Sequence, residues 1–327
     1  MKIIVVGLGS MGKRRIRLIK QLYSNVLIYG VDSRAERRKE AKDLYNVISF
    51  DNIEDAFKEK CDFAFICTSP LSHAELISKC LDENLHVFTE INLVSNKYEE
   101  NIKKARERGL TLFLSSTFCY REEIKYIINA VGTSKSLPTY VYHVGQYLPD
   151  WHPWENYSDY FIGEKQTNGC REIMAIEFPW IFKAFGKITN VSVRRGKKSN
   201  LKINYNDSYL ISLEHKSGIQ GMIAIDVVSR KPVRNLEVFS EDLYLTWDGT
   251  ANGLKGYDFT LKKEKPIKLY DEIDKQDNYA SFIVENAYKN EIETFFNIVN
   301  SSNTTTESVY GFEEDLEILK LIDKIEG

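Results

Sequence analysis

The first third of the chain alternates short apolar runs with charged, amphipathic stretches. The apolar runs predict buried strands at residues 3–6, 26–31, 47–50, 63–67, 86–89 and 110–115. The stretches between them, such as the charged segment 34–44, have the spacing of helices. Continuous apolar runs are typical of strands that are buried on both faces, so we expect a doubly wound parallel sheet.

The pattern changes near residue 118. Beyond it, alternating apolar and polar positions predict strands with one buried face at residues 140–147, 191–195, 209–215, 221–228 and 236–247. Helical spacing appears at residues 121–131, 171–185, 288–300 and 313–325. The expected fold class is therefore α/β. A doubly wound domain over residues 1–118 precedes an α+β domain over residues 119–327, which has an open, mainly antiparallel sheet.

Composition narrows the range of functions. The formal net charge is −3, and a nucleic-acid partner would need a basic face. The short basic clusters at Lys13-Arg14-Arg15 and residues 194–198 are interpreted as solvated surface. No apolar stretch approaches the ~20 residues that span a bilayer, and the five scattered cysteines have the pattern of reduced thiols without metal-ligand spacing. We expect a cytoplasmic protein with no metal and no nucleic-acid or membrane partner.

A glycine-rich turn follows the first predicted strand. Its sequence is Gly7-Leu8-Gly9-Ser10-Met11-Gly12, the pattern G-x-G-x-x-G. Such glycines allow a tight turn, close approach of the backbone to a pyrophosphate, and close packing of helix on strand. The helix that opens at Ser10 and Met11 offers unpaired N–H groups and a positive dipole to the phosphates. The motif in this position predicts a Rossmann-type dinucleotide site.

An acidic residue ends the second predicted strand. Asp32 lies about 20 residues beyond Gly12, where a carboxylate accepts hydrogen bonds from the adenosine ribose. A carboxylate repels a 2′-phosphate, so Asp32 favours NAD. Ser33 and Arg34 follow directly and are able to accommodate that phosphate, which leaves NADP open.

These features resemble the Gfo/Idh/MocA oxidoreductases. Besides the glycine motif and Asp32, the likeness rests on residues after the fourth and fifth strands: Thr68, Ser69, Pro70, His73 and Glu90. It extends over the second half through a glycine-led helix from Asn168-Gly169 to Gly186 and a hairpin at Asp248-Gly249. The resemblance implies a two-domain sugar or cyclitol dehydrogenase, with the residues after the two strands at the cofactor. It also implies a homo-oligomer formed through the C-terminal sheet.

The chain departs from that family at its chemistry. The usual Glu-Lys-Pro is Glu90-Ile91-Asn92 here, and Ile91 neither donates nor accepts a hydrogen bond. On the glycine-led helix, the usual Asp and His positions hold Ile173 and Glu177. These changes place ordinary alcohol dehydrogenation in question.

Other residues are candidates for the proton transfer. Glu177 lies among apolar neighbours, where desolvation raises the pKa of a carboxyl group; the alternative is a structural pair with an arginine. Histidine is a common general acid or base, and His152 lies in the aromatic segment 147–155, which is either a carbohydrate-binding loop or a packed lid. Further candidates are Glu172 for catalysis and, for substrate binding, Asp150, Trp151, Tyr157 and Arg171.

Three functions fit the sequence. The first is an NAD(P)-dependent oxidoreductase that transfers hydride from a sugar or nucleotide-sugar hydroxyl. The second is a cofactor-binding sensor or scaffold that has lost catalysis, which Ile91 favours. The third is an enzyme that reduces and reoxidises a retained NAD within one cycle, as an epimerase, lyase or glycosidase does.

Overall fold

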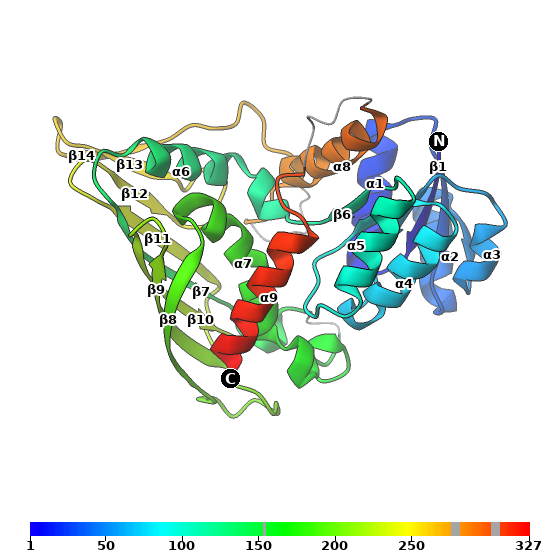
Figure 1. Ribbon diagram of the computed structural model, residues 1–327, viewed down its shortest axis with the longest axis horizontal. Helices are drawn as coiled ribbons and strands as arrows, with labels where there is room; N and C mark the ends of the chain where they lie inside the picture. Colours follow the sequence, from blue (N-terminus) through cyan, green and yellow to red (C-terminus); the bar gives the residue numbers. More distant parts are fainter. Residues whose placement is uncertain (153–154, 276–281, 302–307) are drawn as a thin grey trace. The chain divides into compact units, whose positions relative to one another are not determined.

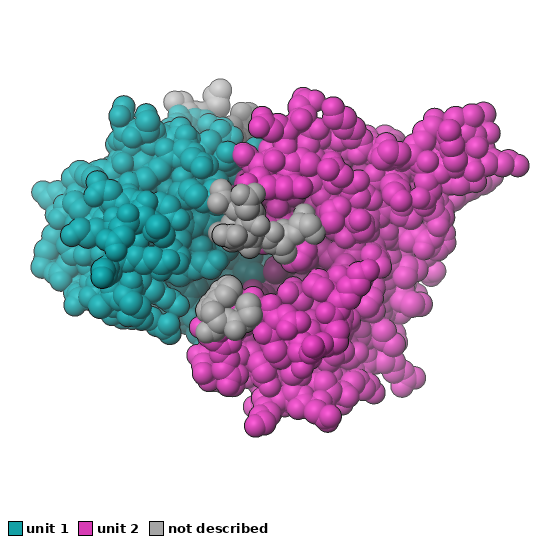
Figure 2. All heavy atoms as spheres, turned by 180° about the vertical axis from the view of Figure 1, so that it is seen from behind, with its two compact units in different colours: residues 1–116, 288–316 teal, residues 117–287, 317–327 magenta. Residues whose placement is uncertain are grey.

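The computed structural model describes residues 1–152, 155–275, 282–301 and 308–327 (Figure 1). The chain divides into two compact units, which Figure 2 shows in teal and magenta. Unit 1 comprises residues 1–116 and 288–316, and unit 2 comprises residues 117–287 and 317–327. The expected division assigned all of residues 119–327 to the second domain, whereas the contacts group residues 288–316 with the first.

Unit 1 is built on a six-stranded sheet in the order β3-β2-β1-β4-β5-β6, and every pair is parallel. The strands are β1 Lys2–Val6, β2 Leu27–Val31, β3 Ile48–Phe50, β4 Phe63–Ile66, β5 His86–Thr89 and β6 Leu112–Leu114. The crossover helices are α1 Ser10–Leu22, α2 Ala35–Tyr45, α3 Ile53–Phe57, α4 Pro70–Asp82 and α5 Tyr98–Glu107. The strand order reverses between β1 and β4, which is where a doubly wound sheet binds its ligand. The expected fold of this part is confirmed.

An aromatic cluster explains why a distant helix belongs to unit 1. Helix α8, Glu285–Asn300, carries Phe295, which is fully buried. Its ring lies 5.5 to 5.7 Å from those of Phe65, Phe88 and Phe113 on β4, β5 and β6. These three rings form a stacked row across the sheet. Periodicity assigned this stretch a helix but contained no information on which sheet would bury it.

Unit 2 contains an eight-stranded sheet in the order β14-β13-β12-β11-β7-β10-β9-β8. Only the β7–β10 pair is parallel, so the expected open, mainly antiparallel sheet is confirmed. The strands are β7 Thr139–Gly145, β8 Ile188–Gly196, β9 Ser208–His215, β10 Gln220–Asp226, β11 Val233–Phe239, β12 Tyr244–Trp247, β13 Lys255–Asp258 and β14 Lys263–Pro266. The α-helices are α6 Glu122–Thr133, α7 Gly169–Phe185 and, ending this unit, α9 Phe312–Glu326; short 3-10 helices are η1 Thr117–Tyr120, η2 Leu148–Asp150, η3 Phe161–Gly163 and η4 Lys165–Thr167.

The prediction of one strand over residues 236–247 is wrong, because the structure has two strands there. They are the hairpin of β11 and β12, because the Ser240 hydroxyl accepts hydrogen bonds from the backbone N–H groups of Asp242 and Leu243 and closes a turn. The alternation of apolar and polar residues continues through that turn, so the sequence pattern did not reveal where β11 ends and β12 begins. Strands β13 and β14 were not predicted; β14 is exposed throughout and has no apolar face to reveal it.

The two faces of this sheet differ. Figure 1 shows α7 along one face, where Tyr140 stacks on Phe185 at 4.1 Å and Tyr142 packs edge-on against Trp180. The other face presents Val141, Leu210 and Met222, which are 43%, 57% and 57% exposed. Met222 lies directly opposite Val141 in the β7–β10 pair. An uncovered apolar patch is therefore centred on the middle strands.

Other features of the described chain are simple. None of its helices combines the length and apolar character needed to cross a membrane. Within the same residues, His, Cys, Asp and Glu form no group of three or more that could hold a metal ion. All five cysteines are unpaired.

The aromatic cluster leads to a stability prediction. Phe295→Ala leaves a cavity between α8 and the sheet, so we expect the free energy of unfolding to fall by about 3–5 kcal/mol. The exposed Phe259, also in an aromatic contact but 49% accessible, is the matched control, and Phe259→Ala is expected to cost about 0.5 kcal/mol or less. Urea unfolding monitored by circular dichroism measures both. Equal losses in the two variants would show that α8 does not complete the core of unit 1.

Candidate functional site

The glycine turn has the geometry that its sequence predicts. Gly7 has a φ of +91°, and a Cβ there would lie 2.6 Å from the carbonyl oxygen of Cys67. A Cβ on Gly12 would lie 1.8 Å from the carbonyl oxygen of Gly7, so only glycine lets α1 pack against β1 here. Gly9 is the N-cap of α1 and Ser10 and Met11 begin the helix, so no capping side chain blocks its first turn. This end of α1 can receive a pyrophosphate.

Asp32 follows β2 and is tied to the glycine turn. Its carboxylate accepts hydrogen bonds from the backbone N–H of Leu8 at 2.8 Å and that of Arg34 at 2.9 Å. Ser33 and Arg34 are exposed beside it. The sequence analysis missed Arg37, whose guanidinium lies 3.6 Å from Asp32 Oδ2 and would be 3.5 Å from a Cβ on Gly9. Its position one turn into α2 was the available signal.

His73 supports the loop between β4 and α4. The ring is buried, with Nε2 3.0 Å from the carbonyl oxygen of Thr68 and Nδ1 2.7 Å from the amide oxygen of Asn92. Burial lowers the pKa of His73, although the contacts with Asn92 and Thr68 oppose that shift. A neutral ring donates from one nitrogen, so it can donate to only one of these two oxygens. Asn92, where the family has proline, lies against this histidine.

The loop above His73 forms the start of α4. Ser69 is the N-cap, Pro70 is in the first turn, and the Thr68 hydroxyl lies 2.7 Å from that of Ser72. The loop follows β4, so it borders the switch point of the sheet. Thr68, Ser69 and Pro70 are thereby placed at the edge where a dinucleotide binds.

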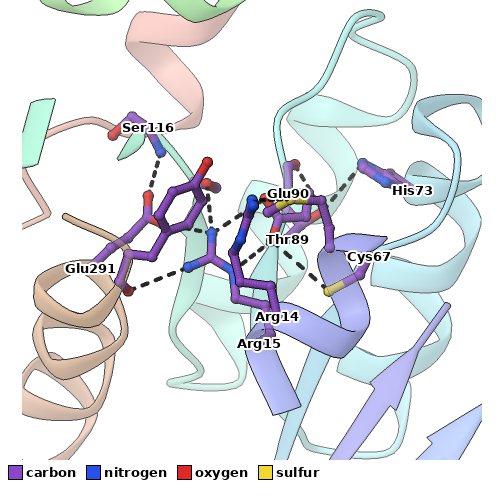
Figure 3. A network of polar contacts seen from close by, with 11 residues as sticks. Arg14, Arg15, Cys67, His73, Thr89, Glu90, Ser116 and Glu291 are labelled. Carbon is purple, nitrogen blue, oxygen red and sulfur yellow. Dashed lines mark hydrogen bonds and ion pairs between the residues drawn. The ribbon is translucent and has the colours of Figure 1, made fainter. Parts of the chain in front are cut away.

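Glu90, directly after β5, belongs to a buried ionic network that Figure 3 shows. Arg15 donates from Nε to Glu90 Oε1 at 2.6 Å and from a terminal nitrogen to Glu90 Oε2 at 3.3 Å. The same terminal nitrogen donates to Glu291 of α8 at 2.7 Å and to the Ser115 hydroxyl at 3.1 Å. Ser116 donates its backbone N–H to the other oxygen of Glu291 at 2.6 Å. The interpretation of Lys13-Arg14-Arg15 as solvated surface is wrong, because Arg15 is fully buried and Arg14 nearly so.

In unit 2, Glu177 is enclosed and fully paired. It is 0% exposed. One oxygen accepts from the Tyr142 hydroxyl at 2.8 Å and the Trp180 indole at 2.7 Å, and the other accepts from Arg234 at 3.0 Å. Three donors occupy its oxygens, and the enclosed carboxylate has no route to a substrate proton. This geometry favours the structural alternative that the sequence left open.

Arg171 also has a structural partner. Its buried guanidinium forms ion pairs with Asp323 at 2.7 Å and with Glu326, both on α9. Asn168 caps α7 by accepting the N–H of Arg171, and its amide nitrogen donates to Glu326. Arg171 therefore fastens the start of α7 to the end of α9, and its charge is already compensated.

Glu172, the next residue, has the opposite environment. It is half-buried, and its carboxylate makes no hydrogen bond or ion pair with any residue that the structure describes. Withdrawal from water raises the pKa of Glu172 to about 7. It lies close enough to Tyr160 to contribute to the raised pKa of that phenol, after burial. The Tyr160 hydroxyl is itself buried without a partner among the described atoms.

His152 joins the same cluster. Its ring stacks on Tyr160 at 4.7 Å, and Nδ1 lies 2.8 Å from Glu155. We call His152, Glu155, Tyr160 and Glu172 the acid/base cluster. The fold thus brings together two of the three candidate catalytic residues, His152 and Glu172, and adds Tyr160. Its position among the acidic residues Glu155, Asp159 and Glu164 was the signal for it.

The candidate substrate-binding residues are partly committed elsewhere. Asp150 is exposed, and Trp151 donates its indole N–H to the carbonyl of Gln146 at 3.2 Å. The Tyr157 hydroxyl accepts the backbone N–H of Lys202 at 3.1 Å. Residues 153–154 of the aromatic segment lie outside the described residues.

Known proteins resemble this chain in sequence and in fold. Residues 1–116 match the family model described as "Oxidoreductase family, NAD-binding Rossmann fold". Myo-inositol 2-dehydrogenase of Thermotoga maritima is 25% identical over 92% of this chain and 89% of its own. 4-Carboxy-2-hydroxymuconate-6-semialdehyde dehydrogenase of Sphingobium sp. is 25% identical, but the match spans only 40% of this chain and 43% of that protein.

Among solved structures, UDP-N-acetylglucosamine 3-dehydrogenase GnnA of Acidithiobacillus ferrooxidans superposes with a TM-score of 0.76 at 18% identity, covering 100% of this chain and 96% of that one. At this identity the likeness concerns the fold. The family model matches the segment that holds the glycine turn, Asp32, the Thr68 loop and Glu90. Residues 1–116 therefore carry the NAD-binding Rossmann domain of the Gfo/Idh/MocA oxidoreductase family, and the family recognised from the sequence is confirmed.

Proposed function

We propose that this protein is an NAD(P)-dependent dehydrogenase that oxidises a hydroxyl group of a sugar, a cyclitol or a nucleotide sugar. The observation that carries the proposal is Glu172, an unpaired carboxylate whose pKa is raised to about 7 beside a buried phenol. A general base works best when its pKa lies near the working pH. The named activities of the myo-inositol and UDP-N-acetylglucosamine dehydrogenases support this substrate class.

The residues divide the chemistry between them. A dinucleotide held at the glycine turn and Asp32 would supply the hydride acceptor, so that the carbon carrying the hydroxyl could become a carbonyl. Glu172 takes the hydroxyl proton, so one alcohol yields one carbonyl, one reduced cofactor and one proton. His152, oriented by Glu155, stacks against Tyr160 and fixes its ring.

The cofactor proposed is NAD, with NADP accepted more weakly. Asp32 keeps a negative charge at the adenosine ribose, because both of its oxygens accept backbone N–H groups. Arg37, 3.6 Å away, offsets part of that charge and offers a cation to a 2′-phosphate. The opposing charges of Asp32 and Arg37 therefore decide whether NAD or NADP binds more tightly.

A cofactor-binding sensor is the second candidate. Ile91 in the lysine position and the fully paired Glu177 favour it, because Ile91 has no group that could transfer a proton and the carboxylate of Glu177 is occupied by three structural donors. An enzyme with internally recycled NAD is distinguished from both by retaining its cofactor through purification. A sensor binds dinucleotide without turnover, and substitution of Glu172 leaves its function unchanged.

The first prediction concerns the pH dependence of oxidation. Only the carboxylate form of Glu172 accepts a proton, and it is populated above its pKa of about 7, so we expect kcat to rise as the pH increases through about 7. Glu172→Gln removes the base and should lower kcat by about 10²–10⁴-fold and abolish this rise. The assay follows reduced cofactor with myo-inositol, UDP-N-acetylglucosamine and related sugars. Exposed Glu164, eight positions earlier in the chain, is the control; equal rates in both variants would refute the role of Glu172.

The second prediction concerns cofactor choice. Asp32→Ala removes the repulsion of a 2′-phosphate and is expected to shift the NAD/NADP affinity ratio toward NADP by about tenfold, near 1.4 kcal/mol. Arg37→Gln is expected to shift the same ratio toward NAD, because the phosphate loses its cation. Fluorescence titration with NADH and NADPH measures both. A shift in the same direction for the two variants would contradict the proposed balance.

The third prediction concerns assembly. We propose that a second copy of the chain covers the apolar patch of Val141, Leu210 and Met222. Met222→Asp places a charge at its centre and is expected to reduce the molar mass in light scattering to that of a smaller species. Leu137, 66% exposed but outside the sheet, provides the control Leu137→Asp. An unchanged mass in Met222→Asp would place any interface elsewhere.

A further inference from the structure

The network around Arg15 has an unusual balance of charge. One guanidinium, 0% exposed, lies between two carboxylates, and the Glu291 side chain is also 0% exposed. Burial raises the pKa of Glu291, and the neighbouring Glu90 adds to the increase while Arg15 opposes it. For Arg15 the two carboxylates outweigh the effect of burial, so its pKa is raised. Arg15 therefore stays charged, and its single positive charge is shared between the carboxylates of Glu90 and Glu291.

The network also has a specific place in the sheet. Cys67, Glu90 and Ser115 each follow directly after β4, β5 and β6, so they lie at the carboxyl edge. A doubly wound sheet binds one half of a dinucleotide over each half of its strands. The glycine turn and Asp32 belong to the adenosine half, which leaves β4, β5 and β6 for the nicotinamide half.

Glu90 is the member of this network that retains access to solvent. Its side chain is 11% exposed, while those of Arg15 and Glu291 are completely buried. Arg15 donates one hydrogen bond to each oxygen of Glu90. An ionised carboxylate has about four acceptor sites, so Glu90 can accept a hydrogen bond from a further donor. Ribose hydroxyls and a carboxamide N–H₂ group are donors of the required kind.

We propose that Arg15, clamped by Glu291, is a positioning residue that fixes Glu90 to receive the nicotinamide half of the cofactor. This inference rests on the proposed dinucleotide binding. Arg15 takes no part in proton transfer, because it is sealed from solvent and its charge is permanent. Ile91 stands where the family has a lysine, so the residue after Glu90 carries no charge. The positive charge next to Glu90 comes instead from the buried Arg15.

A purely structural role for the network makes a different prediction. Arg15 joins α1, the end of β5 and α8, so its loss lowers stability in either case. If the role is only structural, substitutions in the network leave the relative affinity for different parts of the dinucleotide unchanged. If the role is positioning, they weaken only the binding of the nicotinamide half.

The experiment compares NADH with ADP, which contains the adenosine and the two phosphates but lacks the nicotinamide and its ribose. Arg15→Lys keeps the charge and loses the planar fork, and Glu291→Gln keeps the shape and loses one clamp. For each variant that is folded by circular dichroism, we expect the ADP Kd to change by less than about twofold and the NADH Kd to rise about tenfold, near 1.4 kcal/mol. Isothermal titration calorimetry measures both ligands.

Glu123→Gln is the control, since it breaks a buried Arg121–Glu123 pair of the same kind in unit 2. It should lower the melting temperature without changing the ratio of the NADH and ADP Kd values. An unchanged ratio in folded Glu291→Gln protein overturns the positioning role while leaving dinucleotide binding intact. Failure of the unaltered protein to bind either ligand overturns the proposed function together with this inference.

Discussion

The burial of one positive charge, the guanidinium of Arg15, constrains how unit 1 packs. Arg15 is completely buried, and an isolated charge there would be far too costly, so its two carboxylates must be close. Glu90 comes from the end of β5 and Glu291 from α8, about two hundred residues later in the chain. The guanidinium fork therefore holds the cofactor edge of the sheet and a late helix in register. The aromatic packing of Phe295 below it supplies the apolar part of the same contact.

Unit 2 follows the same rule with different residues. Glu177 is neutralised by Arg234, and Arg171 by Asp323 and Glu326, so two residues that were candidates for catalysis or substrate binding are part of the framework. Glu172 differs because no cation reaches it among the described residues. A desolvated carboxyl group without a partner has its pKa raised, which is the condition that general-base chemistry needs. The contrast between neighbours 171 and 172 on α7 separates a structural residue from a candidate catalytic one.

The cofactor half of the site could be predicted well from the chain. Gly7 and Gly12 are required by backbone contacts that any side chain would block, and such steric needs act between residues close in sequence. Asp32 was found because it follows the second strand at a set distance from the glycines. Arg37 and Arg15 were missed, because helical spacing does not tell which side of a helix meets the ligand edge or a buried acid.

By itself, the sequence determined the order of strands and helices, the Rossmann domain and its glycine turn, because apolar periodicity and local sterics act over a few residues. Only the tertiary structure decided which charged side chains would be paired. Glu90, Glu177 and Arg171 found oppositely charged partners from 57 to 155 residues away, and Glu172 found none among the described residues. The pKa of a carboxyl group depends on burial and on charges within a few ångströms. Those neighbours are set by packing between distant segments, which no local pattern encodes.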